Sequence, residues 1–275
     1  MFSTNPFAHL PAAWPAGAMQ VYVVLMVLAV VAGTLLDMVH RGSATYFFAH
    51  WRKTRGKGAP VDVASIAVKT AVVDVLASGE FCNPRRRVAH LLTMYGFILY
   101  VLSTAVMVFG YPTAATPAPA LVAQLWWLGA LMVAVGGYWF WFFIRVDVAA
   151  EGQTPWRIMR ADLFILSLLA SVTLALVWAA LQAMGSGVAP VFFGLYLLAT
   201  TVLFGGVYWS KFAHMFFKPA AAFEKRVSKA NGSNANLPLQ TRDDPAQRER
   251  HSMELLRDAP MDMGLGIKRE APRHY

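Results

Sequence analysis

Charge and cysteine are both scarce in this chain. Only 14% of its 275 residues are charged and 57% are hydrophobic, whereas a soluble globular domain carries roughly 25% charged residues. This deficit excludes an ordinary soluble domain and is typical of an integral membrane protein. The single cysteine, Cys82, excludes an intrachain disulfide and any site built from cysteines alone.

The net charge of +9 would suggest a nucleic-acid partner in a soluble protein. Here the basic residues gather between apolar runs, which is the pattern of cytoplasmic loops in membrane proteins. We therefore expect this chain to lie in a lipid bilayer and to bind no nucleic acid.

Five apolar runs reach the roughly 20 residues that a membrane helix needs. They cover about 19–39, 88–110, 121–144, 162–184 and 188–210. The first has no charged region before it and is long enough to span, so we expect a span there and no cleaved leader. Proline and glycine break the chain at 110–120 and again at 185–190, where a tight hairpin is predicted. The expected fold is an all-α, integral membrane five-helix bundle.

The loops predict the orientation of these spans. Segments 1–18, 111–120 and 185–190 contain no Lys or Arg, whereas 40–87, 145–161 and the start of the tail are rich in both. The positive-inside rule then places the N-terminus outside and the C-terminus in the cytoplasm.

Three regions outside the spans are expected to behave differently. Residues 1–18 form a segment at the outer face, ahead of a membrane domain over 19–227. Within that domain, 61–76 has apolar residues at helical spacing, which predicts an amphipathic helix on the membrane surface or on a partner. Residues 228–275 have the composition of a mostly disordered cytoplasmic tail, in which 245–259 could form a helix on binding.

Two of the seven histidines, His90 and His214, lie near span ends at the same membrane face. If span five continues to Pro219, both imidazoles fall at similar depth. Two imidazoles on different helices of a bundle can ligate a haem iron from opposite sides. The simpler alternative is that each histidine hydrogen-bonds at the interface. Copper or zinc would require further ligands, and none is adjacent.

The residues around these histidines resemble a known family. RRRVAHLLTMYGF around His90 and WSKFAHMFFKPAAAF around His214 resemble the haem b membrane subunits of the respiratory nitrate reductase gamma type. DVLASGEFCNPRRRVAHLLTMYGF is most similar to the sulfur-metabolism branch, which includes the membrane subunit of the quinone-interacting oxidoreductase complex and the membrane anchor associated with adenylylsulfate reductase. The lack of a fused iron–sulfur domain favours the anchor. The resemblance covers about 19–225 and implies the inner membrane of a bacterium.

The chain departs from the dihaem members of this family at two positions. Those members have a second histidine ten residues after the first in span two and another eighteen residues before the last in span five. This sequence has Tyr100 and Tyr196 there, which implies at most one haem b, on His90 and His214. On a continuous helix, Tyr196 would share the face of His214. We expect the two tyrosines to fill the space of the missing group, although the haem chemistry could also be absent altogether.

The resemblance implies a membrane anchor that passes electrons between a cytoplasmic adenylylsulfate reductase-type flavoenzyme and the quinone pool. The chain itself is not expected to act on the sulfur substrate. Arg85, Arg86 and Arg87 form a positive cluster that helps to set the orientation of the spans in the membrane. One of these arginines could also pair with haem propionates.

Asp37 and His40 are candidate residues for a quinone-binding site. Asp162 is better explained as a helix N-cap. The rival hypothesis is a structural anchor without a cofactor. A small-solute transporter is disfavoured because internal repeats and broken polar helices are absent from the sequence.

Overall fold

The structure is a computed structural model that describes most of the chain up to residue 237. The described residues are 2–40, 43–55, 57–79, 81, 83–145, 156, 158–159, 162–210, 214–235 and 237, with the backbone alone at 43, 46, 54, 55, 214 and 216. This part is helical and contains no strand. The chain divides into two compact units, one over 1–41, 84–146 and 155–214, and one over 42–83, 147–154 and 215–275. We call them the membrane unit and the second unit.

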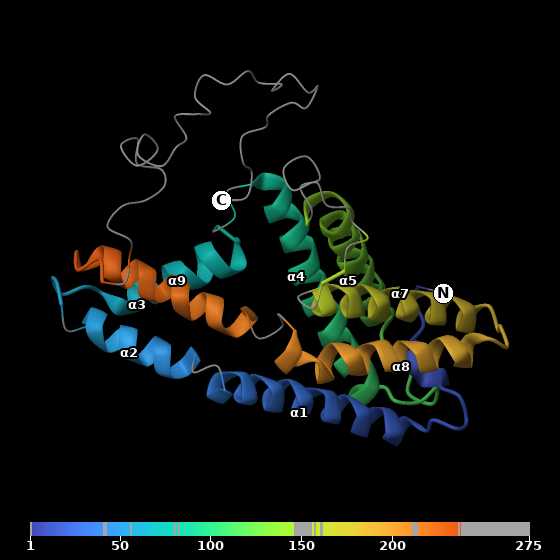
Figure 1. The fold of residues 1–275 in the computed structure, drawn as a ribbon. Helices are drawn as coiled ribbons and strands as arrows, with labels where there is room; N and C mark the ends of the chain where they lie inside the picture. Colours follow the sequence, from blue (N-terminus) through green and yellow to red (C-terminus); the bar gives the residue numbers. More distant parts are fainter. Residues whose placement is uncertain are drawn as a thin grey trace, which may run out of the picture. The chain divides into compact units, whose positions relative to one another are not determined.

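The membrane unit holds the long apolar helices (Figure 1). Its elements are the 3-10 helix η1 (Pro6–His9), α1 (Ala16–His40), α4 (Pro84–Ala105) with its π-helical end η3 (Val106–Gly110), α5 (Ala120–Trp139) with its π-helical end η4 (Phe140–Ile144), α7 (Leu163–Ala183), α8 (Ala189–Gly205) and the 3-10 helix η6 (Val207–Trp209).

Four helices among the described residues are long and apolar enough to cross a membrane. They are Ala16–His40, Pro84–Gly110, Ala120–Ile144 and Leu163–Ala183, whereas the apolar helix Ala189–Gly205 has only 17 residues. Large apolar side chains on these helices, such as Val21, Leu28 and Leu121, are exposed. Exposed apolar surface of this extent is typical of helices that face lipid. The expected all-α, multi-pass membrane class is confirmed at this level.

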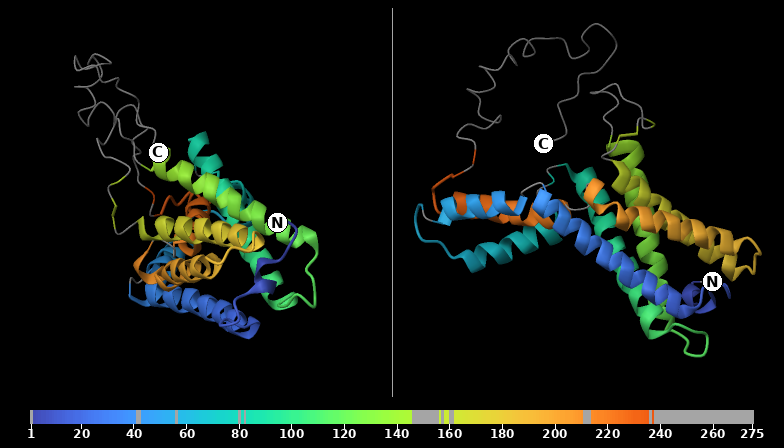
Figure 2. Two further views of the ribbon diagram at one scale, coloured as in Figure 1. Left: turned by 90° about the vertical axis from the view of Figure 1, so that its right-hand side faces the viewer. Right: turned by 60° about the horizontal axis from the view of Figure 1, so that its bottom comes forward.

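The α4 and α5 helices pack with almost no space between their backbones, as the side-by-side ribbons in Figure 2 indicate. A Cβ atom added at Gly129 would lie 2.6 Å from the backbone nitrogen of Tyr100 and 2.7 Å from the carbonyl oxygen of Gly96. One added at Gly136 would lie 2.8 Å from the carbonyl oxygen of Ala89. Small residues allow this close approach, which is a common way for membrane helices to associate.

The α7 and α8 helices form the tight hairpin that the glycines at 185–190 predict. Gly185 takes a positive φ of 68° in the turn, a conformation that glycine adopts without strain. Trp178 of α7 stacks on Tyr196 of α8 with ring centroids 5.7 Å apart, and also packs against Phe193. These rings belong to the buried core of the membrane unit.

The second unit contains α2 (Ser43–Arg55), α3 (Val63–Lys69), the π-helical η2 (Thr70–Leu76) that continues it, and α9 (His214–Ala230). Trp51 of α2 stacks on Phe223 of α9 at 5.2 Å. Arg226 of α9 forms a bidentate ion pair with Asp74 of η2. These contacts hold the helices of the second unit together.

The condition that span five continues to Pro219 is not met. The α8 helix ends at Gly205, and after the short η6 the backbone of Ser210 is extended, with φ −107° and ψ 179°. Adjacent glycines at 205 and 206 weaken the helix at this point. His214 therefore begins a separate helix, α9. Its depth in the membrane cannot be derived from α8, and it cannot be placed on the helix face of Tyr196.

Candidate functional site

His90 lies in the second turn of α4 and is half-buried. Its neighbour Ala89 is fully buried in the α4/α5 contact. His90 is seven residues, or two turns, before Phe97, so these two residues lie on the same face of α4. That face differs from the one on which Ala89 contacts α5. Phe97 packs on Phe204 of α8 with ring centroids 6.4 Å apart. The histidine consequently lies on the face of α4 that turns towards α8.

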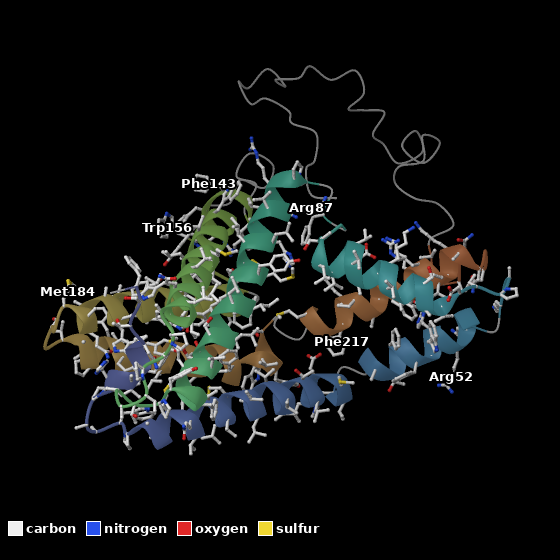
Figure 3. The ribbon with its side chains drawn as sticks, turned by 180° about the vertical axis from the view of Figure 1, so that it is seen from behind. Arg52, Arg87, Phe143, Trp156, Met184 and Phe217 are labelled. Atoms are coloured by element: carbon white, nitrogen blue, oxygen red, sulfur yellow. The ribbon has the colours of Figure 1, made fainter. Side chains whose placement is uncertain are left out.

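The three arginines before His90 occupy the first turns of α4, where Figure 3 labels Arg87. The guanidinium Nη2 of Arg86 donates a hydrogen bond of 3.4 Å to the carbonyl oxygen of Ile144, the last residue of η4. Carbonyls at a helix end lack partners within the helix, so this contact satisfies one of them. Arg85 and Arg87 are exposed. Arg86 thus joins the ends of two helices, a role that the sequence did not indicate.

Asp37 and His40 lie on the face of α1 that contacts η6. Gly33 on this face is so close to Val207 that an added Cβ would lie 2.8 Å from the Val207 Cβ. One turn later Asp37 is only 4% exposed. The His40 ring lies edge-on to Tyr208 with centroids 5.8 Å apart. The structure therefore brings both proposed quinone-site residues to one helix face beside η6.

Asp162 does not cap its helix, although it occupies the N-cap position of α7. Its Oδ1 accepts a hydrogen bond of 2.8 Å from Nε of Arg145, and its Oδ2 accepts one of 2.8 Å from the backbone N–H of Met159. The guanidinium of Arg145 also lies 4.0 Å from the ring centre of Trp141, a cation–π contact. The N-cap prediction is wrong because a cation 17 positions earlier binds the carboxylate.

Tyr100 and Tyr196 are both buried among aromatic rings. Tyr100 packs on Trp126 of α5 with centroids 5.4 Å apart, and Tyr196 stacks on Trp178. The indole N–H of Trp126 donates a hydrogen bond of 3.0 Å to the hydroxyl of Thr104, one turn after Tyr100. Both tyrosines, with Trp126 and Trp178, belong to the buried core of the membrane unit.

A small cavity lies where η1 meets α5 and α7. Its volume is about 80 Å³, and Asn5, His9, Trp127 and Gln182 help to line it. Gln182 donates to the carbonyl oxygens of Pro6 and His9, each at 2.8 Å. Within the described part of the chain, the indole N–H of Trp127 and the amide oxygen of Gln182 have no hydrogen-bond partner. The cavity has room for a few water molecules and is far too small for a haem.

Several predicted features fall outside the described residues. They include the side chain of His214, Cys82, and the tail helix expected over 245–259. In the described residues, no three His, Cys, Asp or Glu side chains are grouped as a metal site. A haem ligated by two histidines does not need such a group.

The fold and these positions define an all-α, multi-pass membrane protein. No protein-family model, no curated protein and no solved structure matches the chain. Its function is therefore argued from its own residues and from the resemblance of its two histidine motifs.

Proposed function

We propose that this chain is a membrane anchor and electron-transfer subunit in the inner membrane of a bacterium. It would link a cytoplasmic iron–sulfur flavoenzyme of adenylylsulfate reductase type to the quinone pool in sulfur metabolism. The motifs around His90 and His214 suggest this role, and the position of His90 on α4 is the structural observation that supports it most.

The proposal includes five spans, with α8 as the fifth. A helix of 17 residues is about 26 Å long at 1.5 Å per residue, and the three residues of η6 add about 6 Å. Together they are long enough to match the hydrocarbon thickness of about 30 Å. An odd number of spans puts the two termini on opposite sides. The basic segments between the spans then favour an outer N-terminus and a cytoplasmic C-terminus.

His90 and His214 are the residues that would hold a single haem b. A bound haem b supplies reversible one-electron transfer. His90 suits this role because the tight α4/α5 contact uses Ala89, Gly96 and Tyr100 and leaves the imidazole on another face. Phe204 of α8 contacts Phe97 on that face, and the chain that follows α8 leads to His214.

Charged groups are proposed to bind the haem propionates and to line the quinone site. Arg85 and Arg87 are exposed at the start of α4, where guanidinium groups would suit the carboxylates of haem propionates. Arg86 is already bound to the end of η4, so we assign it a lesser part. Asp37 and His40 are the proposed groups beside the quinone, which takes up two protons when it is reduced by two electrons. The sulfur chemistry would belong to the soluble partner.

Visible spectroscopy of the purified full-length chain, expressed with sufficient haem, tests this function. We expect the reduced-minus-oxidised bands of a b-type haem, lost in both His90→Ala and His214→Ala. His9→Ala is the matched control, because His9 lies in η1 beside the small cavity, and it should keep the bands. A protein without such bands, or bands that survive both substitutions, would refute the electron-carrier role.

The alternative function is a structural anchor without a redox cofactor. Two observations favour it: aromatic side chains fill the interior around Tyr100 and Tyr196, and α8 ends before His214. Under this alternative, a cytoplasmic partner would still co-purify with the chain from native membranes, but no haem bands would be seen.

A further inference from the structure

The helix formed by α3 and η2 exposes a row of apolar side chains, while the polar side chains of Thr70 and Asp74 lie on its inward face. Val68, Val72 and Leu76 follow one another at four-residue spacing and are 64%, 51% and 49% exposed. Thr70, on the opposite face, is 3% exposed, and the side chain of Asp74 is 10% exposed. A helix on the surface of a soluble protein has the reverse arrangement.

The inward polar groups are satisfied, so the arrangement is stable as it stands. The hydroxyl of Thr70 donates a hydrogen bond of 2.8 Å to the carbonyl oxygen of Ile66. Asp74 accepts hydrogen bonds from Nε and Nη2 of Arg226 at 2.5 and 2.7 Å. The ion pair attaches the polar face to α9 and directs the apolar face away from it.

The position of this helix in the chain indicates what covers the apolar face. Only residues 41–42 separate α1 from α2, and only 77–83 separate η2 from α4. The segment therefore leaves one membrane-spanning helix and enters the next within a few residues at each end. Leu76, at the end of the apolar face, is eight positions before Pro84, where a membrane-spanning helix begins.

The composition of the exposed face favours lipid over a protein partner. It consists of small aliphatic side chains, among them Ala64 and Ala71, with no aromatic or arginine residue of the kind that dominates protein interfaces. Exposed basic side chains accompany it in the same unit, and they attract anionic headgroups. They include Arg52, Lys53, Lys57, Lys69 and Lys225, and Figure 3 labels Arg52 on α2.

We propose that the face formed by Ala64, Val68, Val72 and Leu76 inserts into the interface of an anionic lipid leaflet, on the side of the membrane that carries the basic loops. Lysines around the face bind the headgroups, and the aliphatic side chains enter the boundary with the acyl chains. This inference requires only that the chain is a membrane protein and stands without the proposed electron transfer.

Spin labels on the full-length protein in lipid nanodiscs test this inference. The single cysteine makes labelling simple, since Cys82→Ser removes it and Val68→Cys or Val72→Cys then gives one site. Lys229→Cys, at the exposed end of α9, is the matched control. In nanodiscs that contain phosphatidylglycerol, we expect labels at 68 and 72 to collide with oxygen and to be shielded several-fold from a water-soluble nickel chelate. The label at 229 should show the opposite preference.

Three results would overturn the proposal. Labels at 68 and 72 that meet the nickel chelate as readily as the label at 229 would show that the face lies in water. Labels shielded from both oxygen and nickel would show that protein covers it. Equal insertion into nanodiscs made only of phosphatidylcholine would refute the part played by anionic lipid, because we expect the label at 72 to shift towards water there.

Discussion

Asp74 and Arg226 are 152 residues apart in the sequence and form the main polar link within the second unit. The hydrogen bonds from the Arg226 guanidinium hold the pKa of the Asp74 carboxyl below its ordinary value of 3.8, and partial burial opposes this shift. Because the side chains are only 10% and 28% exposed, the pair is shielded from water better than most surface ion pairs. It should therefore contribute to the stability of α9.

We predict that Arg226→Gln loosens the contact of α9 with η2. Loss of a charged hydrogen-bond pair at a mostly buried site should lower local stability by about 1–3 kcal/mol. Amide hydrogen exchange of the full-length protein measures this as faster exchange over residues 70–76 and 220–230. Lys229→Gln removes the same charge from an exposed position of α9 and should leave exchange unchanged. Equal effects of the two substitutions would contradict a specific ion pair.

The same pair predicts a dependence on pH. Since the pKa of Asp74 is lower in the folded state than in the unfolded state, its stabilisation is complete above about pH 4 and is lost as the pH falls through the lowered pKa. Hydrogen exchange of residues 70–76 should accelerate, beyond the intrinsic effect of pH, in acid for the native sequence. Arg226→Gln should lack this acceleration, and a variant that retains it would count against the assignment.

At the scale of elements, the contact between α4 and α5 defines where His90 can face. The α4/α5 contact depends on Gly96, Gly129 and Gly136. A Cβ atom added at any of them would lie within 3 Å of backbone atoms of the other helix. Backbone atoms cannot move aside cheaply, in contrast to the end of a flexible side chain.

We predict that Gly129→Ala destabilises the membrane unit by about 1–3 kcal/mol through overpacking. Gly194→Ala is the matched control, because nothing lies within 4 Å of an added Cβ at that position of α8. It should leave stability unchanged or raise it by up to about 1 kcal/mol, as alanine favours helix more than glycine does. Thermal unfolding in detergent measures both. Similar unfolding of the two variants would show that the α4/α5 backbones are not in close contact.

Apolar runs predicted most helices of the membrane unit because helices in lipid must be apolar over their whole length. The short α2 was missed, since SATYFFAHWRKTR mixes apolar, polar and basic residues without a clear repeat. The start of α9 could be taken for an extension of span five, because only six residues separate α8 from the apolar stretch FAHMFF. The glycine pair at 205 and 206 was the signal that could have indicated the break.

At the scale of the whole molecule, the sequence predicted candidate residues better than their contacts. Asp37 and His40 do share a face, which their spacing on one helix requires. Arg86 binds Ile144, the last residue of η4, and Asp162 binds Arg145, the residue that follows η4. Such long-range pairs have no signal in a single sequence. The structure shows that Tyr100 and Tyr196 are buried, and that they fill the space of a second haem stays a prediction from the resemblance.

The central claim is that the chain carries one haem b at the end of the bundle where His90 lies and none where Tyr100 and Tyr196 are buried. The most direct test is the ratio of haem to protein in the purified full-length chain, from a pyridine haemochrome assay and quantitative amino-acid analysis. We predict one b-type haem per chain. A ratio of zero under haem-replete expression would support the structural anchor, and a ratio of two would contradict the packed aromatic interior.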